Sequence, residues 1–212
     1  MTGRKCFVVC FAVLTLSLVS IAVFFGAFRG RSIRVACVGD SITTSSTYPS
    51  DLQDLLGSDY NVKEFGVVGS TVLSNGYNPY IDQPEFQEAK EFLPTIVVVL
   101  LGTNDAREDI YQAIDNFVGE YKQLINEIQA LASNPKILLV IPPPLFENNL
   151  FLSNVHLLNG VIPRIEQVAE ELGLPLVDVY TPLDGHPECF VDGVHPNYDG
   201  SAIIAGEVYK AF

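Results

Sequence analysis

Positive charge is scarce outside the first 34 positions of this 212-residue chain. Those positions hold five of the 12 lysines and arginines, and all 25 aspartates and glutamates follow them. The rest of the chain therefore combines seven basic with 25 acidic residues, a net charge of −18. A surface this acidic repels nucleic acid and anionic polymers, so we expect neutral or cationic partners and no nucleic acid.

Several motifs of catalysis and binding are also absent. The pattern G-x-S-x-G, which marks the nucleophile turn of the α/β-hydrolases, occurs nowhere in the chain. No cluster of His, Cys or Asp has metal-ligand spacing, and no phosphate-binding loop is present. We therefore expect neither a metal nor a cofactor.

Cysteine is sparse, with four residues in the whole chain. Cys6 and Cys10 lie one helical turn apart in an apolar N-terminal segment. Cys37 and Cys189 lie in the remainder of the chain. A disulfide between Cys37 and Cys189 stays open, although two buried free thiols are the favoured interpretation.

The apolar N-terminal segment, Cys6–Phe28, is the longest stretch without a charge. As a helix it would be about 34 Å long, enough to cross a bilayer. Basic residues flank it, and its Gly26-Ala27-Phe28 end is a poor cleavage site. We predict that residues 1–32 form a transmembrane signal anchor, with the rest on the extracytoplasmic side. Secretion after cleavage is the alternative, and the nearly balanced flanking charges leave the orientation open.

Residues 33–212 have the length of one domain with a full core. Short apolar runs predict five strands: Ile33–Val38, Asn61–Phe65, Ile96–Leu101, Ile137–Ile141 and Leu176–Val179. Helical patterns lie between or after them: Asp51–Leu56, Asp109–Leu131, Val155–Leu172 and Ser201–Ala211. This alternation predicts a three-layer α/β/α sandwich around a flavodoxin-like parallel sheet with strand order 2-1-3-4-5. Two long loops, Ser70–Pro94 and Pro142–Leu152, would lie where ligands bind such sheets.

Four short motifs lie where the predicted strands end or shortly before the C-terminal helix. They are Gly39-Asp40-Ser41, Gly66-Val67-Val68-Gly69, Gly102-Thr103-Asn104-Asp105 and Asp192-Gly193-Val194-His195. Taken singly, each is weak, because a turn, a glycine-rich connection or a helix start has the same composition. Their order and shared edge of the sheet favour a functional site. Asp105 is expected to brace its loop.

Acyl transfer by a serine needs a base, a group that orients the base, and donors for an oxyanion. Asp192 and His195 are three residues apart, so a turn can set the carboxylate against one imidazole nitrogen. The other nitrogen would then face outward. The backbone N–H groups of Ser41 and Gly69 and the side-chain amide of Asn104 could supply the oxyanion donors.

These four motifs closely resemble the sequence blocks of the SGNH hydrolases, also called the GDSL esterase/lipase family, from about residue 33 to the chain end. The resemblance implies that Ser41 is the nucleophile and His195 the base, oriented by Asp192. It also implies that Gly69 and Asn104 join the Ser41 N–H as oxyanion donors.

Within the family, the segments GDSIT, LGTNDA and FVDGVHPN look most like carbohydrate and sialate O-acetylesterases. The resemblance thus implies a serine esterase for small acyl esters, mainly acetyl, of carbohydrates or other small molecules. Two positions depart from the family: Phe65 stands where Asn often precedes the glycine, and Ile42 where Leu often follows the serine. Alternatives are a lipid-directed esterase or thioesterase, and a non-catalytic, membrane-tethered glycan-binding domain.

Aromatic residues on the two long loops are candidates for substrate contact. Tyr77, Tyr80, Phe146 and Phe151 either form a wall for a sugar or acyl group or pack the loops themselves. His186 is a further candidate, with an ordinary loop position as the alternative.

Overall fold

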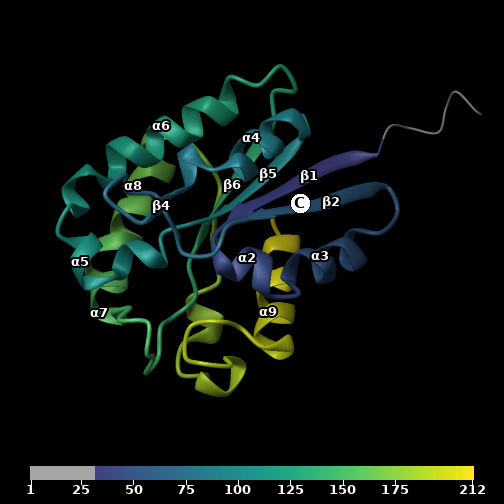
Figure 1. Ribbon diagram of the computed structural model, residues 1–212. Helices are drawn as coiled ribbons and strands as arrows, with labels where there is room; N and C mark the ends of the chain where they lie inside the picture. The colour runs from purple at the N-terminus through teal and green to yellow at the C-terminus, as the bar shows by residue number, and fades with distance from the viewer. Residues whose placement is uncertain (1–31) are drawn as a thin grey trace, which may run out of the picture. The chain divides into compact units, whose positions relative to one another are not determined.

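The computed structural model describes residues 32–212, of which Ile33–Phe212 form one compact unit (Figure 1). The predicted N-terminal transmembrane segment lies outside the described residues. Within residues 32–212, no helix combines the length and the apolar character that crossing a bilayer requires.

Five parallel strands form the central sheet in the order β2-β1-β5-β6-β7. Their bounds are β1 Ile33–Gly39, β2 Tyr60–Gly66, β5 Ile96–Leu100, β6 Lys136–Ile141 and β7 Leu176–Asp178. This confirms the predicted strands and the predicted order. The inner strands β1, β5 and β6 are almost wholly buried, as expected when helices cover both faces of a sheet.

The register of the sheet brings three strand ends together. Gly39, the last residue of β1, pairs with Gly66 at the end of β2 and with Leu100 at the end of β5. Because the strands are parallel, the segments that follow them leave the sheet at one edge. Three of the four sequence motifs begin at this edge.

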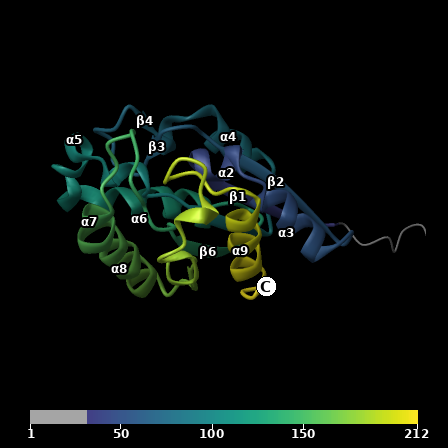
Figure 2. The same ribbon diagram turned by 90° about the horizontal axis from the view of Figure 1, so that it is seen from below.

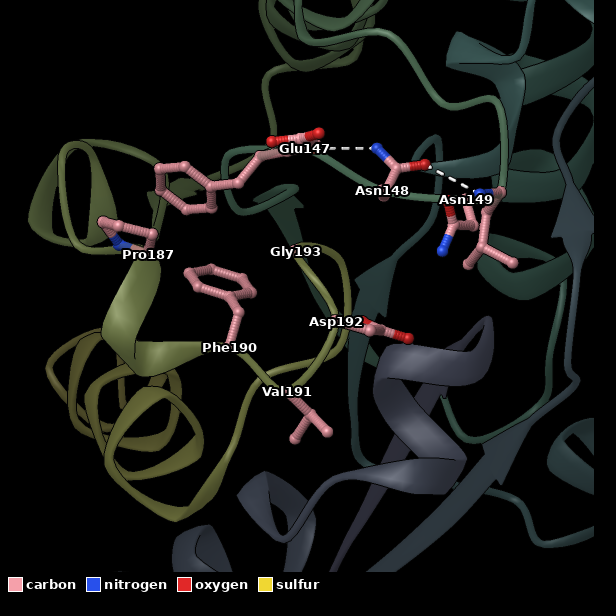
Figure 3. A pocket seen from close by; sticks show the side chains of 10 residues that line it. Glu147, Asn148, Asn149, Pro187, Phe190, Val191, Asp192 and Gly193 are labelled. Carbon is pink, nitrogen blue, oxygen red and sulfur yellow. Dashed lines mark hydrogen bonds between the residues drawn. The ribbon is translucent and has the colours of Figure 1, made fainter.

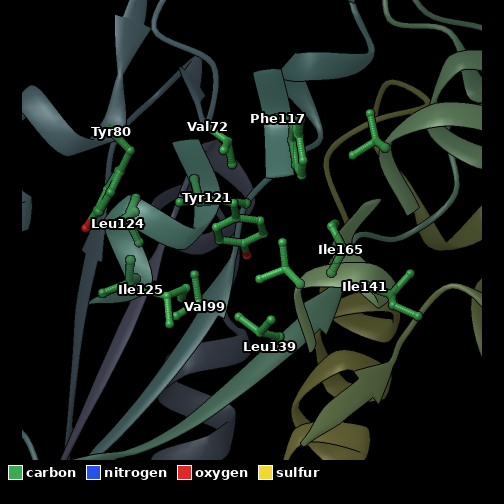
Figure 4. Packing of buried hydrophobic residues seen from close by; sticks show 14 of the residues in the cluster. Val72, Tyr80, Val99, Phe117, Tyr121, Leu124, Ile125, Leu139, Ile141 and Ile165 are labelled. Atoms are coloured by element: carbon green, nitrogen blue, oxygen red, sulfur yellow. The ribbon is translucent and has the colours of Figure 1, made fainter. Parts of the chain in front are cut away.

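Helices cover both faces of the sheet, which confirms the three layers. One face packs against α4 (Pro84–Glu91), α6 (Phe117–Gln129) and α8 (Ile162–Leu172). The other face packs against α3 (Tyr48–Leu56) and α9 (Tyr198–Tyr209), which lie side by side (Figure 2). The larger core contains the buried rings of Phe117 and Tyr121 from α6, together with Val99 and Leu139 from the sheet (Figure 4).

Two predicted helices are interrupted. The pattern over Asp109–Leu131 is divided among α5 (Glu108–Tyr111), a 3₁₀ turn and α6. A 3₁₀ turn repeats every three residues, so the apolar spacing continues through the break. The pattern over Val155–Leu172 contains α7 (Asn154–His156), a π turn and α8. Pro163, in the first turn of α8, has no N–H to donate, which accounts for an irregular turn just before it.

The segment Ser70–Pro94 was predicted to be a loop, but part of it forms strands and helices. It contains the two-residue strands β3 (Ser70–Thr71) and β4 (Asn78–Pro79), a 3₁₀ turn and helix α4. Helix α4 buries only Phe86 and Ala89, and two apolar positions are too few to reveal a helical period.

Both cysteines of the described region are buried and unbonded. Burial raises the pKa of Cys37 to about 12, although Tyr48 bonds its sulfur. The interpretation of two buried free thiols is therefore confirmed.

Candidate active site

Ser41 is the first residue of the short helix α2 (Ser41–Ser45), directly beyond the end of β1. Asp40 caps this helix, because its side chain accepts a hydrogen bond of 2.9 Å from the Ile42 N–H. The first N–H groups of a helix have no partner within it, so the Ser41 N–H remains available as a donor. The cap thus fixes both the hydroxyl and the N–H of Ser41.

A chain of side-chain hydrogen bonds joins Ser41 to the last of the four motifs. His195 Nε2 lies 2.9 Å from Ser41 Oγ, and His195 Nδ1 lies 2.7 Å from Asp192 Oδ2. The two ring nitrogens therefore face opposite partners. An Nδ1–H donated to the carboxylate leaves Nε2 free to accept the serine proton.

The Asp192 carboxylate is held by its own turn. Its Oδ1 accepts backbone N–H bonds from Val194, at 3.1 Å, and from His195, at 2.8 Å. Partial burial alone would raise the pKa of Asp192, but these bonds and the bond with the imidazole lower it below the ordinary value. The carboxylate consequently stays ionised wherever the imidazole is neutral.

Gly193, between Asp192 and Val194, fits a position that no other residue could take unchanged. Its φ is +83°, and a Cβ there would lie 2.2 Å from the carbonyl oxygen of Glu147. The Phe146 N–H donates to the Gly193 carbonyl at 2.8 Å. The turn Asp192–His195, which carries the base, therefore packs in close backbone contact with the 142–152 loop.

The predicted oxyanion donors leave the same edge of the sheet as Ser41. Gly69 has a φ of +73°, a conformation that favours glycine, and lies just after β2. Asn104 opens a 3₁₀ turn after β5, and its side-chain amide donates to the Ser70 carbonyl at 2.9 Å. That bond orients the amide and leaves its second N–H free to bind a ligand.

Two buried carboxyl groups, those of Asp40 and Asp105, hold backbone segments next to the site through hydrogen bonds. Asp105 accepts N–H bonds from Val72, at 3.0 Å, and from Leu73, at 2.8 Å, which confirms its bracing role. Burial is the main cause that raises the pKa of Asp105 to about 7 and that of Asp40 to about 6. The two groups also repel each other when both are ionised.

An open pocket of about 810 Å³ borders this site at Asp192 (Figure 3). Ser41 and His195 are not among its lining residues, so the pocket borders the hydrogen-bonded chain at Asp192, the end away from the serine. The residues that line it come from the 142–152 loop and the turn before His195: Phe146, Glu147, Asn148, Asn149, Leu150, Pro187, Phe190, Val191, Asp192 and Gly193.

The five candidates for substrate contact have different surroundings. Tyr80 is fully buried and donates its hydroxyl to the Phe65 carbonyl, so its expected place in a substrate wall was wrong. His186 is paired at the surface with Glu188 at 2.8 Å and does not line the pocket.

Phe146 does line the pocket, where its ring packs on Phe190 with centroids 5.1 Å apart. Tyr77 and Phe151 are strongly exposed.

Two residues whose contacts bear on the site were not recognised from the sequence. Asp40 was noted only as a neighbour of the serine. An Asp directly before the first residue of a helix is nevertheless a common N-cap. Arg107 contacts both Tyr77 and Phe151. Nothing in its sequence context distinguishes Arg107 from a solvated surface residue.

Comparison with known proteins agrees with this geometry. Residues 37–203 match the GDSL-like Lipase/Acylhydrolase family. The chain is 32% identical over 200 residues to an acetylxylan esterase of Xylanibacter ruminicola, a match that covers 82% of this chain and 42% of that protein. The chain spans 42% to 54% of the length of the curated relatives that it matches.

Solved structures share the fold. A carbohydrate acetylesterase family member from Sinorhizobium meliloti superposes with a TM-score of 0.64 at 24% identity, over 84% of this chain and 96% of that one. An acetyl xylan esterase superposes with a TM-score of 0.68 at 23% identity, over 84% and 99% of the respective chains.

Proposed function

This chain belongs to the GDSL-like lipase/acylhydrolase family, a family of carboxylic ester hydrolases, and we propose that it is a serine esterase that removes small acyl groups, chiefly acetyl, from carbohydrates. The observation that carries the proposal is the hydrogen-bond chain from Ser41 through His195 to Asp192, with lengths of 2.9 Å and 2.7 Å. These lengths lie within the reach that proton transfer between a nucleophile and its base requires.

Acylation begins when Ser41 Oγ attacks the ester carbonyl carbon and its proton passes to His195 Nε2. Asp192 stabilises the resulting imidazolium through Nδ1. Hydrogen bonds from the N–H groups of Ser41 and Gly69 and from the amide of Asn104 stabilise the negative charge on the carbonyl oxygen. Collapse of the tetrahedral intermediate expels the alcohol oxygen, which takes the proton from His195.

Deacylation repeats these steps with water. His195 Nε2 accepts a proton from a water molecule, whose oxygen attacks the carbonyl of the acyl-serine. The same donors stabilise the second oxyanion, and Ser41 Oγ leaves with the proton held by His195. The products are a carboxylic acid and free enzyme, so every proton is accounted for by the described side chains and water.

A carbohydrate ester is supported by the form and charge of the site. The open pocket beside Asp192 does not enclose the serine, so a large alcohol group can remain partly in solvent. The acidic chain repels anionic polymers and anionic lipid surfaces, whereas acetylated neutral sugars carry no charge to be repelled. The relative from Xylanibacter ruminicola, an acetylxylan esterase, acts on a substrate of this class.

Initial rates over three substrate groups test this proposal. The groups are acetylated xylo-oligosaccharides, p-nitrophenyl esters of increasing acyl length, and lysophospholipids. We expect kcat/KM to be highest for the acetylated sugars and to fall steadily from acetyl to octanoyl esters. A preference for octanoyl esters or lysophospholipids would instead support the lipid-directed alternative.

A further inference from the structure

Two large aromatic side chains of the long loops face solvent. Tyr77 is 70% exposed and Phe151 is 74% exposed. Phe151 also has a φ of +60°, a left-handed conformation that is strained for a residue with a Cβ. Residues held in such backbone conformations cluster at active sites and ligand clamps.

One arginine joins the two rings. The Arg107 guanidinium carbon lies 5.1 Å from the centre of the Tyr77 ring and 6.0 Å from that of the Phe151 ring. Asp109 accepts from Arg107 Nε and from the Tyr77 hydroxyl, each at 2.9 Å. We call this set of Tyr77, Arg107, Asp109 and Phe151 the rim cluster. Its hydrogen bonds fix the arginine and the tyrosine in place before any ligand binds.

The 142–152 loop connects the rim cluster to the site, because the loop is anchored at both ends. Near its start, the Phe146 N–H bonds the carbonyl of Gly193, in the turn of the base. Just past its end, the Ser153 N–H bonds the carbonyl of Ala106, two residues after Asn104. Leu152 also forms a bridge with Arg107. The loop therefore runs along the site from the base to the oxyanion side, and Phe151 lies at the latter.

The chemistry of the rim cluster suits one kind of ligand. Exposed aromatic faces bind the apolar faces of neutral pyranose rings, and the terminal N–H groups of an arginine donate to hydroxyls. The carboxylate of Asp109 and the acidic surface disfavour an anionic ligand. We propose that the rim cluster binds unmodified sugar units of a carbohydrate chain whose neighbouring acetylated unit occupies the site at Ser41. This inference rests on the proposed function.

Binding without turnover tests the inference independently of catalysis. In the Ser41→Ala background, titration calorimetry with xylohexaose, which carries no ester, should detect binding. Adding Phe151→Gly should weaken that binding about tenfold, as expected for the loss of one stacked ring. Glycine also relieves the positive φ, so the urea midpoint of unfolding should stay equal or rise.

A matched control separates this effect from the general loss of an aromatic ring. Tyr209→Ala removes a partly exposed ring at the far end of α9, about 16 Å along that helix from the turn that carries His195. It should leave xylohexaose binding unchanged. Equal binding by the Phe151→Gly and Tyr209→Ala variants, or a lower urea midpoint for Phe151→Gly, would overturn the inference.

Turnover supplies a second readout with serine present. Phe151→Gly should lower the ratio of kcat/KM on acetylated xylan to kcat/KM on an acetylated monosaccharide about tenfold, through KM. An unchanged ratio in an enzyme that deacetylates xylan would remove the rim cluster from the account and leave the proposed function standing. If the wild-type protein hydrolyses esters but no acetylated sugar, the proposed substrate class itself fails.

Discussion

Asn104 uses one amide N–H to bond the Ser70 carbonyl, and the other is free for an oxyanion. The Asn104→Ala variant should lower kcat by about 10²–10³, the usual loss for one oxyanion donor, with little change in KM. Steady-state kinetics on an acetyl ester measure both constants. As a control, Asn75→Ala removes a comparable bond from an amide to the Ile110 carbonyl and should leave kcat unchanged. An effect confined to KM would place Asn104 in substrate binding instead.

The Asp192–His195 pair determines how kcat/KM should fall at low pH. Hydrogen bonds lower the pKa of Asp192, so its carboxylate remains ionised while His195 gains a proton. Within this pair only one group should therefore gain a proton, and log kcat/KM should fall with a slope of one as pH decreases. Rates on an acetyl ester between pH 4 and 8 give this slope. A flat profile would exclude a histidine base, and a slope of two would show that protonation of Asp40, whose pKa burial raises to about 6, also lowers activity.

At the scale of elements, the contact between the turn of the base and the 142–152 loop depends on Gly193. Gly193→Ala places a Cβ 2.2 Å from the Glu147 carbonyl oxygen and forces the two segments apart. Gly185→Ala is a matched control, because Gly185 has a similar φ of +77° but nothing within 4 Å of a Cβ.

Both variants should lose about 1 kcal/mol of unfolding free energy from backbone strain. Only Gly193→Ala should lose more than this and also lower kcat/KM at least tenfold, since only it displaces Asp192 and His195. Urea unfolding and kinetics of the two variants provide the comparison. Equal kinetics for both would mean that the loop contact does not position the base.

The elements recovered from the sequence are those with long apolar patterns. All five sheet strands were predicted, since buried parallel strands are continuous apolar runs. Helix α2 was missed, because its Ser-Ile-Thr-Thr-Ser sequence is rich in residues that favour strands and turns. Helix α4 could have been found from Pro84, which opens it, although its apolar face is short.

The site was predictable to the extent that it lies in contiguous motifs. The sequence predicted that Ser41, Asp192 and His195 act together, and the structure places them within hydrogen-bond reach. The surroundings of Tyr80 were not predictable, because a tyrosine on a long loop can face the core or solvent. The contact of Arg107 with Phe151 joins residues 44 positions apart through tertiary structure alone.

At the scale of the whole molecule, the buried carboxyl of Asp105 links stability to pH. Burial raises the pKa of Asp105 to about 7, so the folded state binds a proton that the unfolded state has already lost. Its contribution is complete below about pH 4 and is lost as pH rises through about 7. Between pH 5 and 7.5 the fold should lose on the order of 2 kcal/mol through this group.

The Asp105→Asn variant isolates this contribution. Its side chain cannot titrate, although it accepts fewer N–H bonds and should lower stability at every pH. Urea unfolding at pH 5 and at pH 7.5 should show a smaller loss for the variant than for the wild type. An equal loss in both proteins would mean that Asp105 is ionised throughout this range.

The central claim is that Ser41 is a nucleophile activated by His195, and covalent labelling tests it most directly. A fluorophosphonate probe should add once to the intact protein, and peptide mass spectrometry should place the adduct on Ser41. Ser41→Ala should abolish labelling, and His195→Ala should slow it strongly. Ser70→Ala, which removes a buried hydroxyl directly after the second motif, should leave labelling unchanged. Labelling that persists in Ser41→Ala, or an adduct on Ser70, would contradict the account.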